Sequence, residues 1–422
     1  MPEKFHQWLS VAFLLLTWYV PRQTAPGGYL EDFLVLRWIT FILIPIIVLA
    51  FLLYRLKANP KIYLGNIIWP VLLLFVVVLL SGAVNKSTSV ATAFTLLIYL
   101  RYPLLFLVLI NWDLNEKSLD IFLKLFFILV IIQIPETFYR YFISGIRWDH
   151  ISWTLGPWGH FDLGVYMMYA TALIVARSLI FRIRKAYVIV IGCFFLVALF
   201  GEIKAYIFFA PLTICFVVWN CLAFTIPRRR FYAIISLAVV AALSFSATIA
   251  LYERVFPESR DLHHIRTALD PGQEGRIHRV AAFTDLLRKL GRDPAPALLG
   301  WGPGSSLAGE LGVEADTGFD IPIRHKNQLA ETFIDLGFAG LIAYFWLLFC
   351  LFGQYRRHYK LEKEKKYLYL NRALTGIWIF FAFLGPLYDL VWRHDSPNYV
   401  FFFLTAVIYC RYRKLRDESS AD

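Results

Sequence analysis

One long polar stretch of the chain, residues 253–328, is rich in cations and lies between two apolar runs. Its basic residues include two groups, Arg276 with Arg279 and then Arg324, His325 and Lys326. Guanidinium groups match phosphate oxygens in bidentate fashion, and a helix starting directly after the second group would add free amides. The pattern predicts a site for an anionic substrate. Pairing with acidic residues of the same stretch and contact with anionic lipid headgroups are the other interpretations.

The sequence offers little for a metal ion or for a nucleophile triad. His263 and His264 are adjacent, which is poor spacing for two ligands on one helix face. The chain has no clustered Asp-x-Asp pair, no P-loop and no Gly-x-Ser-x-Gly elbow. We therefore expect a cationic site that works without a metal and without a cofactor.

Apolar runs indicate the class of protein. Of the 422 residues, 59% are hydrophobic and only 17% are charged, fewer charges than a soluble chain of this length exposes. Runs of about 20 apolar residues match the hydrocarbon thickness of a bilayer at helical rise. Lipid favours helices because each backbone amide is satisfied within its own segment. We predict an all-α integral membrane protein with about 12 transmembrane helices.

The charge of the connections predicts the orientation of these helices. The predicted helices cover 8–20, 33–54, 63–80, 90–110, 118–137, 161–180, 187–200, 205–224, 231–252, 329–352, 372–391 and 399–410. Basic residues occupy mostly every second connection and the C-terminal tail, which is the positive-inside pattern. It predicts a multi-pass protein of the bacterial inner membrane with both termini in the cytoplasm. The formal net charge of +12 then reflects topology, and no nucleic-acid partner is expected.

The connection between the ninth and tenth helices is far longer than a link requires. The predicted domains are transmembrane helices one to nine at 1–252, a periplasmic loop at 253–328, and helices ten to twelve with a basic cytoplasmic tail at 329–422. Within the loop, four apolar residues recur at helical spacing: Phe283, Leu286, Leu287 and Leu290. They predict an amphipathic helix that lies on the membrane surface or packs onto the bundle. A tight glycine-rich turn follows at 300–304.

Three stretches in about the last third of the chain carry a resemblance to a known family. They are Gly275-Arg276 ahead of the amphipathic helix, the run from Asp293 through Gly300-Trp301-Gly302-Pro303-Gly304 to Ser305, and Lys326-Asn327 through Glu331 to Gly337-Phe338-Ala339-Gly340. They resemble the Gly-Arg, Gly-x-Gly-Pro-Gly and His-Asn…Gly-x-x-Gly segments of the O-antigen ligase and O-antigen polymerase superfamily. These are polytopic bacterial envelope glycan enzymes with one large, late periplasmic loop.

Two positions depart from the family's pattern. Lys326 stands where the family has its usual histidine, and His325 comes one residue earlier. Glu202-Ile203-Lys204 replaces the family's common Ser-Arg turn, so Lys204 keeps the positive charge without the guanidinium fork. Polymerases are the more variable branch of the family, so these departures favour a polymerase over a ligase.

The resemblance implies a glycosyltransferase that acts on undecaprenyl-diphosphate-linked glycan. Its partners would be this donor, an acceptor glycan, membrane lipids and other polysaccharide-assembly membrane proteins. The charge of the departing lipid diphosphate would be neutralised by Arg276, Arg279, Lys204 and Lys326. The acceptor hydroxyl would lose its proton to His325 or Glu331, with inversion at the anomeric carbon. Further candidate contacts to the diphosphate or glycan are Arg324, Asn327, Gly302 and Gly304.

The expected function is polymerisation of O-antigen or exopolysaccharide repeat units. One alternative is a ligase that transfers the lipid-linked glycan to lipid A-core or to protein. From another class, the alternative is a lipid-linked glycan flippase or a secondary transporter. A transporter would show internal repeats, broken mid-membrane helices and charges near the midplane, whereas the cations here cluster at the predicted outer face.

Overall fold

The computed structural model describes most of the apolar part of the chain. The described residues are 39–58, 62–112, 114, 116–145, 155, 159–181, 184–201, 203–222, 286, 290, 294–307, 327–388 and 391–419, with 12, 14, 15 and 17 near the start. Their regular structure is helical, without strands among these residues. The prediction of an all-α fold is therefore confirmed for this part of the chain.

The described residues form the following helices, given in chain order. Their bounds are α3 Ile39–Ala58, α4 Ile68–Val84, α5 Ser89–Leu109, α6 Glu116–Phe142, α7 His160–Ile180, α8 Lys185–Phe200, α9 Lys204–Leu222, α13 Gln328–Leu361, α14 Lys365–Ile379, α15 Gly385–Tyr388 and α16 Asp395–Ser419. Shorter helical elements are η2 Ala295–Ala297, η3 Ser305–Leu307, the π-helical η5 Phe380–Leu384 and η6 Val391–Arg393. The bounds of α5, α7, α8 and α9 lie within about three residues of the predicted ranges. Helix α13 ends at Leu361, beyond the predicted range 329–352, and α16 at Asp395–Ser419 extends past both ends of the predicted range 399–410.

Five of the described helical segments are long and apolar enough to cross a membrane. They are α5, α6, α7, α13 and the segment Lys365–Leu387. Shorter apolar helices add Ile42–Tyr54, Ile68–Val84, Lys185–Phe200 and Ala205–Cys221. Large apolar side chains such as Trp69, Phe75 and Leu80 of α4 are exposed, as expected for a surface that faces lipid. The predicted number of about 12 crossings also involves ranges such as 231–252, which lie outside the described residues.

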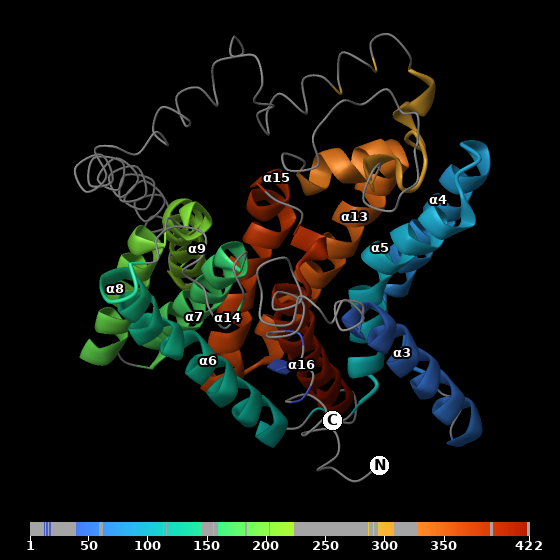
Figure 1. Cartoon of the computed structure of the whole chain (residues 1–422). Helices are drawn as coiled ribbons and strands as arrows, with labels where there is room; N and C mark the ends of the chain where they lie inside the picture. Colours follow the sequence, from blue (N-terminus) through green and yellow to red (C-terminus); the bar gives the residue numbers. More distant parts are fainter. Residues whose placement is uncertain are drawn as a thin grey trace.

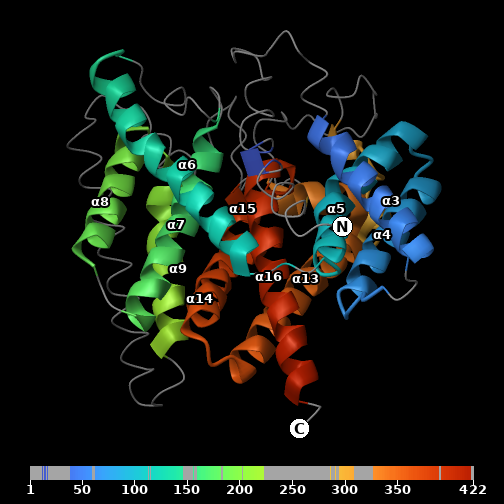
Figure 2. The same ribbon diagram turned by 90° about the horizontal axis from the view of Figure 1, so that it is seen from below.

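Helices α13, α14 and α16 stand between two groups of helices (Figures 1 and 2). On one side, α7 and α9 pack against each other and against α14, and α6 and α8 lie outside them. On the other side, α5 packs against α3, α4 and α16, and α4 packs against α13. Residues from both halves of the sequence therefore meet along α13 and α16.

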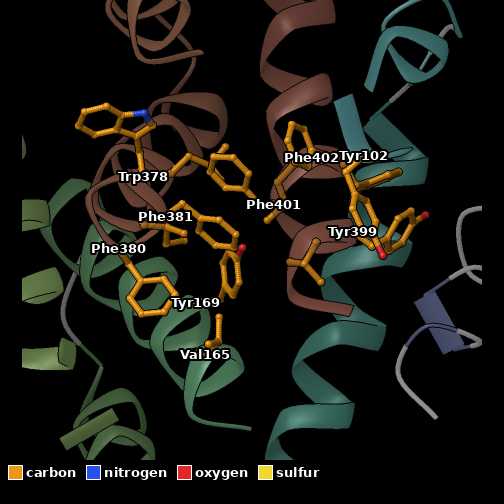
Figure 3. Close-up of a cluster of buried hydrophobic side chains, with 14 of the residues drawn as sticks. Tyr102, Val165, Tyr169, Trp378, Phe380, Phe381, Tyr399, Phe401 and Phe402 are labelled. Carbon is orange, nitrogen blue, oxygen red and sulfur yellow. The ribbon is translucent and has the colours of Figure 1, made fainter. Parts of the chain in front are cut away.

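Aromatic side chains fill the space between the two groups (Figure 3). Phe381 stacks on Phe401 of α16 with ring centroids 4.4 Å apart, and Tyr169 of α7 approaches Phe381 at 6.2 Å. On the other side of α16, Phe402 stacks on Tyr102 of α5 at 6.2 Å. Aromatic pairs of this kind add to the packing that joins α5, α7, α14 and α16.

The predicted helix 372–391 was wrong in its bounds and its continuity. Helix α14 begins earlier, at Lys365, and passes into the π-helical element η5 before α15 ends at Tyr388. Pro386 lies in α15 and has no amide hydrogen for the carbonyl four residues earlier, which accompanies the change to π-helical hydrogen bonding in η5. Tyr344 of α13 donates to the carbonyl of Phe381 within η5 at 2.7 Å. Val391 belongs to the separate element η6.

Candidate functional site

Helix α13 is broken one third of the way from its start. Gly337 has φ 63° and ψ −158°, which is not a helical conformation. Across the break, the amide of Trp301 donates to the carbonyl of Ile334 at 2.8 Å, and the amide of Ala339 donates to the carbonyl of Leu298 at 3.0 Å. The glycine-rich segment therefore takes over backbone groups that a continuous helix would satisfy internally. Figure 1 shows the first part of α13 turned away from the direction of the rest.

The two segments touch closely through glycines. A Cβ atom on Gly337 would lie 2.5 Å from the carbonyl carbon of Leu298, and one on Gly300 would lie 2.6 Å from that of Asp335. Ser81 of α4 contacts the same region, because its hydroxyl donates to the carbonyl oxygen of Asp335 at 2.9 Å. The glycine-rich turn and the start of α13, which carry two of the three stretches of the resemblance, form one packed unit.

This contact predicts a strong effect of a single methyl group. Gly337→Ala should destabilise the protein by more than about 2 kcal/mol, because an L-residue at positive φ is strained and the methyl group meets the backbone of the turn. Gly353→Ala is the matched control in the same helix, since a Cβ there has nothing within 4 Å. Thermal unfolding in detergent measures both, and equal melting temperatures for the two variants would contradict this account.

Gly302 and Gly304 lie against the connection between α4 and α5. Both have positive φ, 111° and 82°. A Cβ on Gly302 would lie 2.5 Å from Ser87 Oγ, and one on Gly304 would lie 2.7 Å from the Cβ of Ala91. The two glycines thus permit close packing of the turn on these helices. Their predicted contact with diphosphate or glycan stays a prediction.

Asn327 caps α13. Its backbone is extended, with φ −112° and ψ 161°, and its side chain accepts a hydrogen bond from the amide of Ala330 at 2.8 Å. Such a cap satisfies one of the free amides of the first turn. Asn327 is buried, so the position that the sequence assigns to substrate binding also fixes where α13 begins.

Glu331 lies inside the protein and carries an ion pair. Its Oε1 accepts from the guanidinium of Arg393, whose Nε is 3.0 Å away and whose Nη2 is closer. Ser306 Oγ, from the far end of the glycine-rich segment, lies 3.3 Å from the same oxygen. Glu331 Oε2 accepts no hydrogen bond from a described residue. Among the described side chains, Glu331 is the only charged one of the candidate site residues predicted from the sequence. Its role as a base stays a prediction.

Asp335, one turn later, is a second buried carboxylate on the same helix. Its Oδ1 accepts from the amide of Ser306 at 2.8 Å, and its Oδ2 accepts from the hydroxyl of Ser306 at 2.9 Å. Ser306 therefore joins two carboxylates, Glu331 and Asp335, that lie four residues apart on α13. This arrangement ties the glycine-rich segment to the buried charges as well as to the helix backbone.

A second buried ion pair lies between α5 and α16. Arg101 Nη2 lies 2.6 Å from Asp395 Oδ1 and donates to the carbonyl of Trp392 at 3.2 Å. Tyr102 donates its hydroxyl hydrogen to the same carboxylate oxygen at 2.9 Å. Both side chains are almost completely shielded, with 0% and 2% of their surfaces exposed. Arg101 and Asp395 are 294 residues apart in the chain, so only the fold brings them together.

A third pair joins a carboxylate to a histidine. Asp162 Oδ1 of α7 lies 2.5 Å from Nδ1 of His394, and the ring of Phe161 packs on the imidazole at 4.4 Å between centroids. Asp162 stands in the first turn of α7, where the helix N-terminus favours a negative charge. The backbone of His394 is fixed as well, because Asn398 donates its side-chain amide to the carbonyl of His394 at 2.8 Å.

Further polar side chains join α13 to the segment before α16 and to α5. Gln328 accepts at Oε1 from the amide of Trp392 at 3.1 Å. Tyr99 of α5 donates to Thr332 of α13 at 3.0 Å, one residue after Glu331. The segment 391–395 thus meets α5, α7 and α13 at one place, and we call Glu331, Arg393, Arg101, Asp395, Asp162 and His394 the buried charge cluster.

The side chains of the six cationic residues predicted to bind diphosphate lie outside the described part of the structure. Arg276, Arg279, Arg324, His325 and Lys326 lie outside the described residues. Lys204 is the first residue of α9, and its side chain is not described. The predicted diphosphate contacts of these six residues stay predictions.

The predicted amphipathic helix of the loop contributes two described side chains to the bundle. Leu286 is buried with Phe333 and Ile334 of α13, and Leu290 packs against the same cluster. Both belong to the predicted amphipathic helix, for which packing on the bundle and lying on the membrane were the two interpretations. For these two side chains, the observed contacts favour packing on the bundle.

The opposite end of α13 carries ion pairs of a different kind. Glu362 accepts from His358 at 3.1 Å and from Arg411 at 2.9 Å, and Lys366 pairs with Glu116 and Asp120. Burial alone would raise the pKa of Glu362, but hydrogen bonds from His358, Arg411 and the amide of residue 364 lower it to about 2. The stabilisation from this lowered pKa is present above the ordinary value of 4.5 and is lost as pH falls toward 2. These contacts bring together the ends of α6, α13, α14 and α16 that the charge pattern assigns to one side.

The sequence held a signal for most of the buried charge cluster. Arg101 and Asp162 both lie in predicted apolar helices, and an ionisable residue at membrane depth is a functional candidate by default. Arg393 lies in the described element η6, and its guanidinium pairs with Glu331. His394 and Asp395 lie in the short polar step between two apolar runs and carried no motif.

The described residues contain no group of three or more His, Cys, Asp or Glu side chains placed to hold a metal ion. The cluster can instead neutralise charge with its two arginines and accept protons with its carboxylates and its imidazole. In comparisons with known proteins, no family model and no curated protein matched this chain.

Proposed function

We propose that the protein is a membrane glycosyltransferase that polymerises undecaprenyl-diphosphate-linked repeat units into O-antigen or exopolysaccharide. One observation carries the proposal. The turn at 300–304 and the start of α13 resemble two separate segments of the O-antigen ligase and polymerase superfamily, and they pack as one unit beside the Glu331–Arg393 pair. Segments that act together in one site are expected to meet in this way.

The chemistry requires charge neutralisation and a proton acceptor. An acceptor hydroxyl attacks the anomeric carbon of the lipid-linked sugar, and the bond from that carbon to the diphosphate oxygen breaks. The diphosphate leaves with the bonding electrons, so cations such as Arg276, Arg279 and Lys326 would stabilise it. Attack from the opposite face would invert the anomeric configuration.

A transporter or flippase has one observation in its favour, the break in α13. Broken helices often line transport sites near the middle of the membrane. The segment 338–361 is nevertheless long enough, at about 1.5 Å per residue, to cross a hydrocarbon core of ~30 Å by itself. The break at Gly337 then falls near the edge of that crossing, which suits a site at the membrane surface.

The adjacent residues His325 and Lys326 should have separate roles. A permanently charged Lys326 suits the diphosphate, whereas His325 suits proton transfer. In purified protein, Lys326→Ala should weaken donor binding strongly, and His325→Ala should slow turnover with donor binding nearly intact. Equal and mild effects of the two substitutions would remove the division of roles.

Deletion of the gene separates the three functions in cells. Loss of a polymerase should leave surface glycans with a single repeat unit. Loss of a ligase should leave long polymers on the lipid carrier, and loss of a flippase should leave single repeat units at the cytoplasmic face. Electrophoresis of surface glycan and analysis of lipid-linked intermediates distinguish these outcomes, and only the first supports the proposal.

A further inference from the structure

We propose that Asp335 is held as a neutral carboxylic acid, and that its proton holds the glycine-rich segment against the start of α13. The ligand of this site is the proton itself. Aspartate is ordinarily ionised at neutral pH, so the folded chain has to provide the reason for a neutral form. The proton site is a property of the fold and does not depend on the proposed glycan transfer.

The hydrogen bonds of Ser306 show that a hydrogen is needed. Its Oγ lies 2.9 Å from Oδ2 of Asp335 and 3.3 Å from Oε1 of Glu331. A serine hydroxyl carries one hydrogen, and an ionised carboxylate only accepts hydrogen bonds. If both carboxyl groups were ionised, one of these two contacts would join two oxygens without a hydrogen, whatever else Ser306 contacts. A proton on one of the carboxyl groups supplies the missing hydrogen.

The guanidinium of Arg393 indicates which carboxyl group carries that proton. Glu331 Oε1 accepts from Nε of Arg393 at 3.0 Å and also from Nη2, so this oxygen carries no proton of its own. Among the described residues, the carboxyl group of Asp335 contacts only the amide and the hydroxyl of Ser306. The proton therefore belongs on Oδ2 of Asp335. Asp335 then donates to Ser306 Oγ, and Ser306 donates to Glu331 Oε1.

Burial favours the same assignment. Asp335 is 1% exposed, and Glu331, about one helical turn earlier on α13, is 0% exposed. Two negative charges this close and out of contact with water would repel each other, and a neutral acid removes that cost. In the described part of the chain, the titratable groups that face the two carboxyl groups are Arg393 of η6 and Tyr99 of α5. Only Arg393 is a cation, so one protonated carboxyl group balances the charge of this set.

The proton couples docking of the glycine-rich segment to pH. Both the amide and the hydroxyl of Ser306 bind Asp335, so the docked segment is held most firmly when Asp335 is protonated. An unfolded aspartate ionises near pH 4, so at neutral pH the folded protein binds one proton more than the unfolded chain. The resulting stabilisation is complete below about pH 4 and is lost as pH rises until Asp335 ionises.

The test compares Asp335→Asn with the unsubstituted full-length protein in detergent, from about pH 5 to about pH 10. The asparagine amide donates to Ser306 Oγ as the protonated acid does, and its carbonyl oxygen still accepts from the amide of Ser306. At the acidic end the two melting temperatures should agree within about 2 °C. As pH rises, the unsubstituted protein should lose melting temperature relative to the variant. The infrared difference spectrum of the two proteins at neutral pH should show the carbonyl band of a protonated carboxylic acid.

Glu362→Gln is the matched control at the other end of α13. The side chain of Glu362 is 1% exposed and accepts from Arg411, so it is a buried carboxylate that is ionised. This variant should melt lower by on the order of 5 °C and should keep the acid band.

An ionised Asp335 would give the opposite results. Asp335→Asn would then melt lower at the acidic end, by as much as Glu362→Gln or with loss of folding, and the difference spectrum would lack the acid band. Either result overturns the assignment. None of these measurements requires glycan transfer, so a failure of the proposed function leaves them unchanged.

Discussion

Arg101→Leu is expected to destabilise the protein by about 3–5 kcal/mol, which is the cost of leaving one member of a buried ion pair without its partner. Asp395 is 4% exposed, and its Oδ1 would lose the guanidinium while keeping the hydrogen bond from Tyr102. Water cannot replace the guanidinium at that depth. Unfolding of the purified protein in detergent, followed by circular dichroism, measures the loss.

Two further variants isolate the charge from the packing. Asp395→Asn added to Arg101→Leu removes the buried charge while keeping an acceptor for Tyr102, so the double variant should recover much of the lost stability. Lys366→Met is the control for an exposed pair, because Glu116 and Asp120 are about half exposed and such pairs contribute about 0–1 kcal/mol. A loss in Arg101→Leu no larger than in Lys366→Met would show that the buried pair does not stabilise the fold.

The second large effect is expected at Arg276. Arg276→Ala should abolish glycan assembly, a loss on the order of 10²-fold or more in turnover, because the departing diphosphate loses a bidentate donor. Arg276→Lys should restore activity only in part, since an ammonium group cannot make two parallel hydrogen bonds to the phosphate oxygens. Chain-length distribution of the surface glycan in cells gives the result directly.

Arg416→Ala is the matched control for this substitution. Arg416 lies near the end of α16, is about half exposed, and pairs with its neighbour Asp417. The variant should assemble glycan like the unsubstituted protein. Membrane levels of all three variants must be equal, and a normal chain-length distribution in Arg276→Ala would reduce Arg276 to a surface residue.

Hydrophobic length and charge were sufficient to predict most of the described helices. Helix α7 was predicted at 161–180 and found at His160–Ile180, because an apolar run flanked by polar residues leaves few other solutions in lipid. The break at Gly337 was not predicted, since it depends on a turn some 35 residues earlier in the chain docking against it. The π-helical element before Pro386 was missed because the apolar run continues through it.

The site was less predictable than the fold. Glu331 was identified through the resemblance, but its partner Arg393 lies 62 residues away and is brought near only by the fold. The pairs Arg101–Asp395 and Asp162–His394 have larger separations still, and no spacing rule links such residues. What the sequence offered was the cost of each charge at membrane depth, which marks Arg101 and Asp162 as residues that need partners.

The central claim is that the protein joins lipid-linked repeat units, and reconstitution tests it most directly. Purified protein in liposomes would be supplied with undecaprenyl-diphosphate-linked repeat units taken from cells that lack the gene. The account predicts a ladder of products that differ by one repeat unit, with one undecaprenyl diphosphate released for each unit added. Movement of the lipid-linked unit across the liposome membrane, without chain growth and without release of the lipid diphosphate, would contradict it.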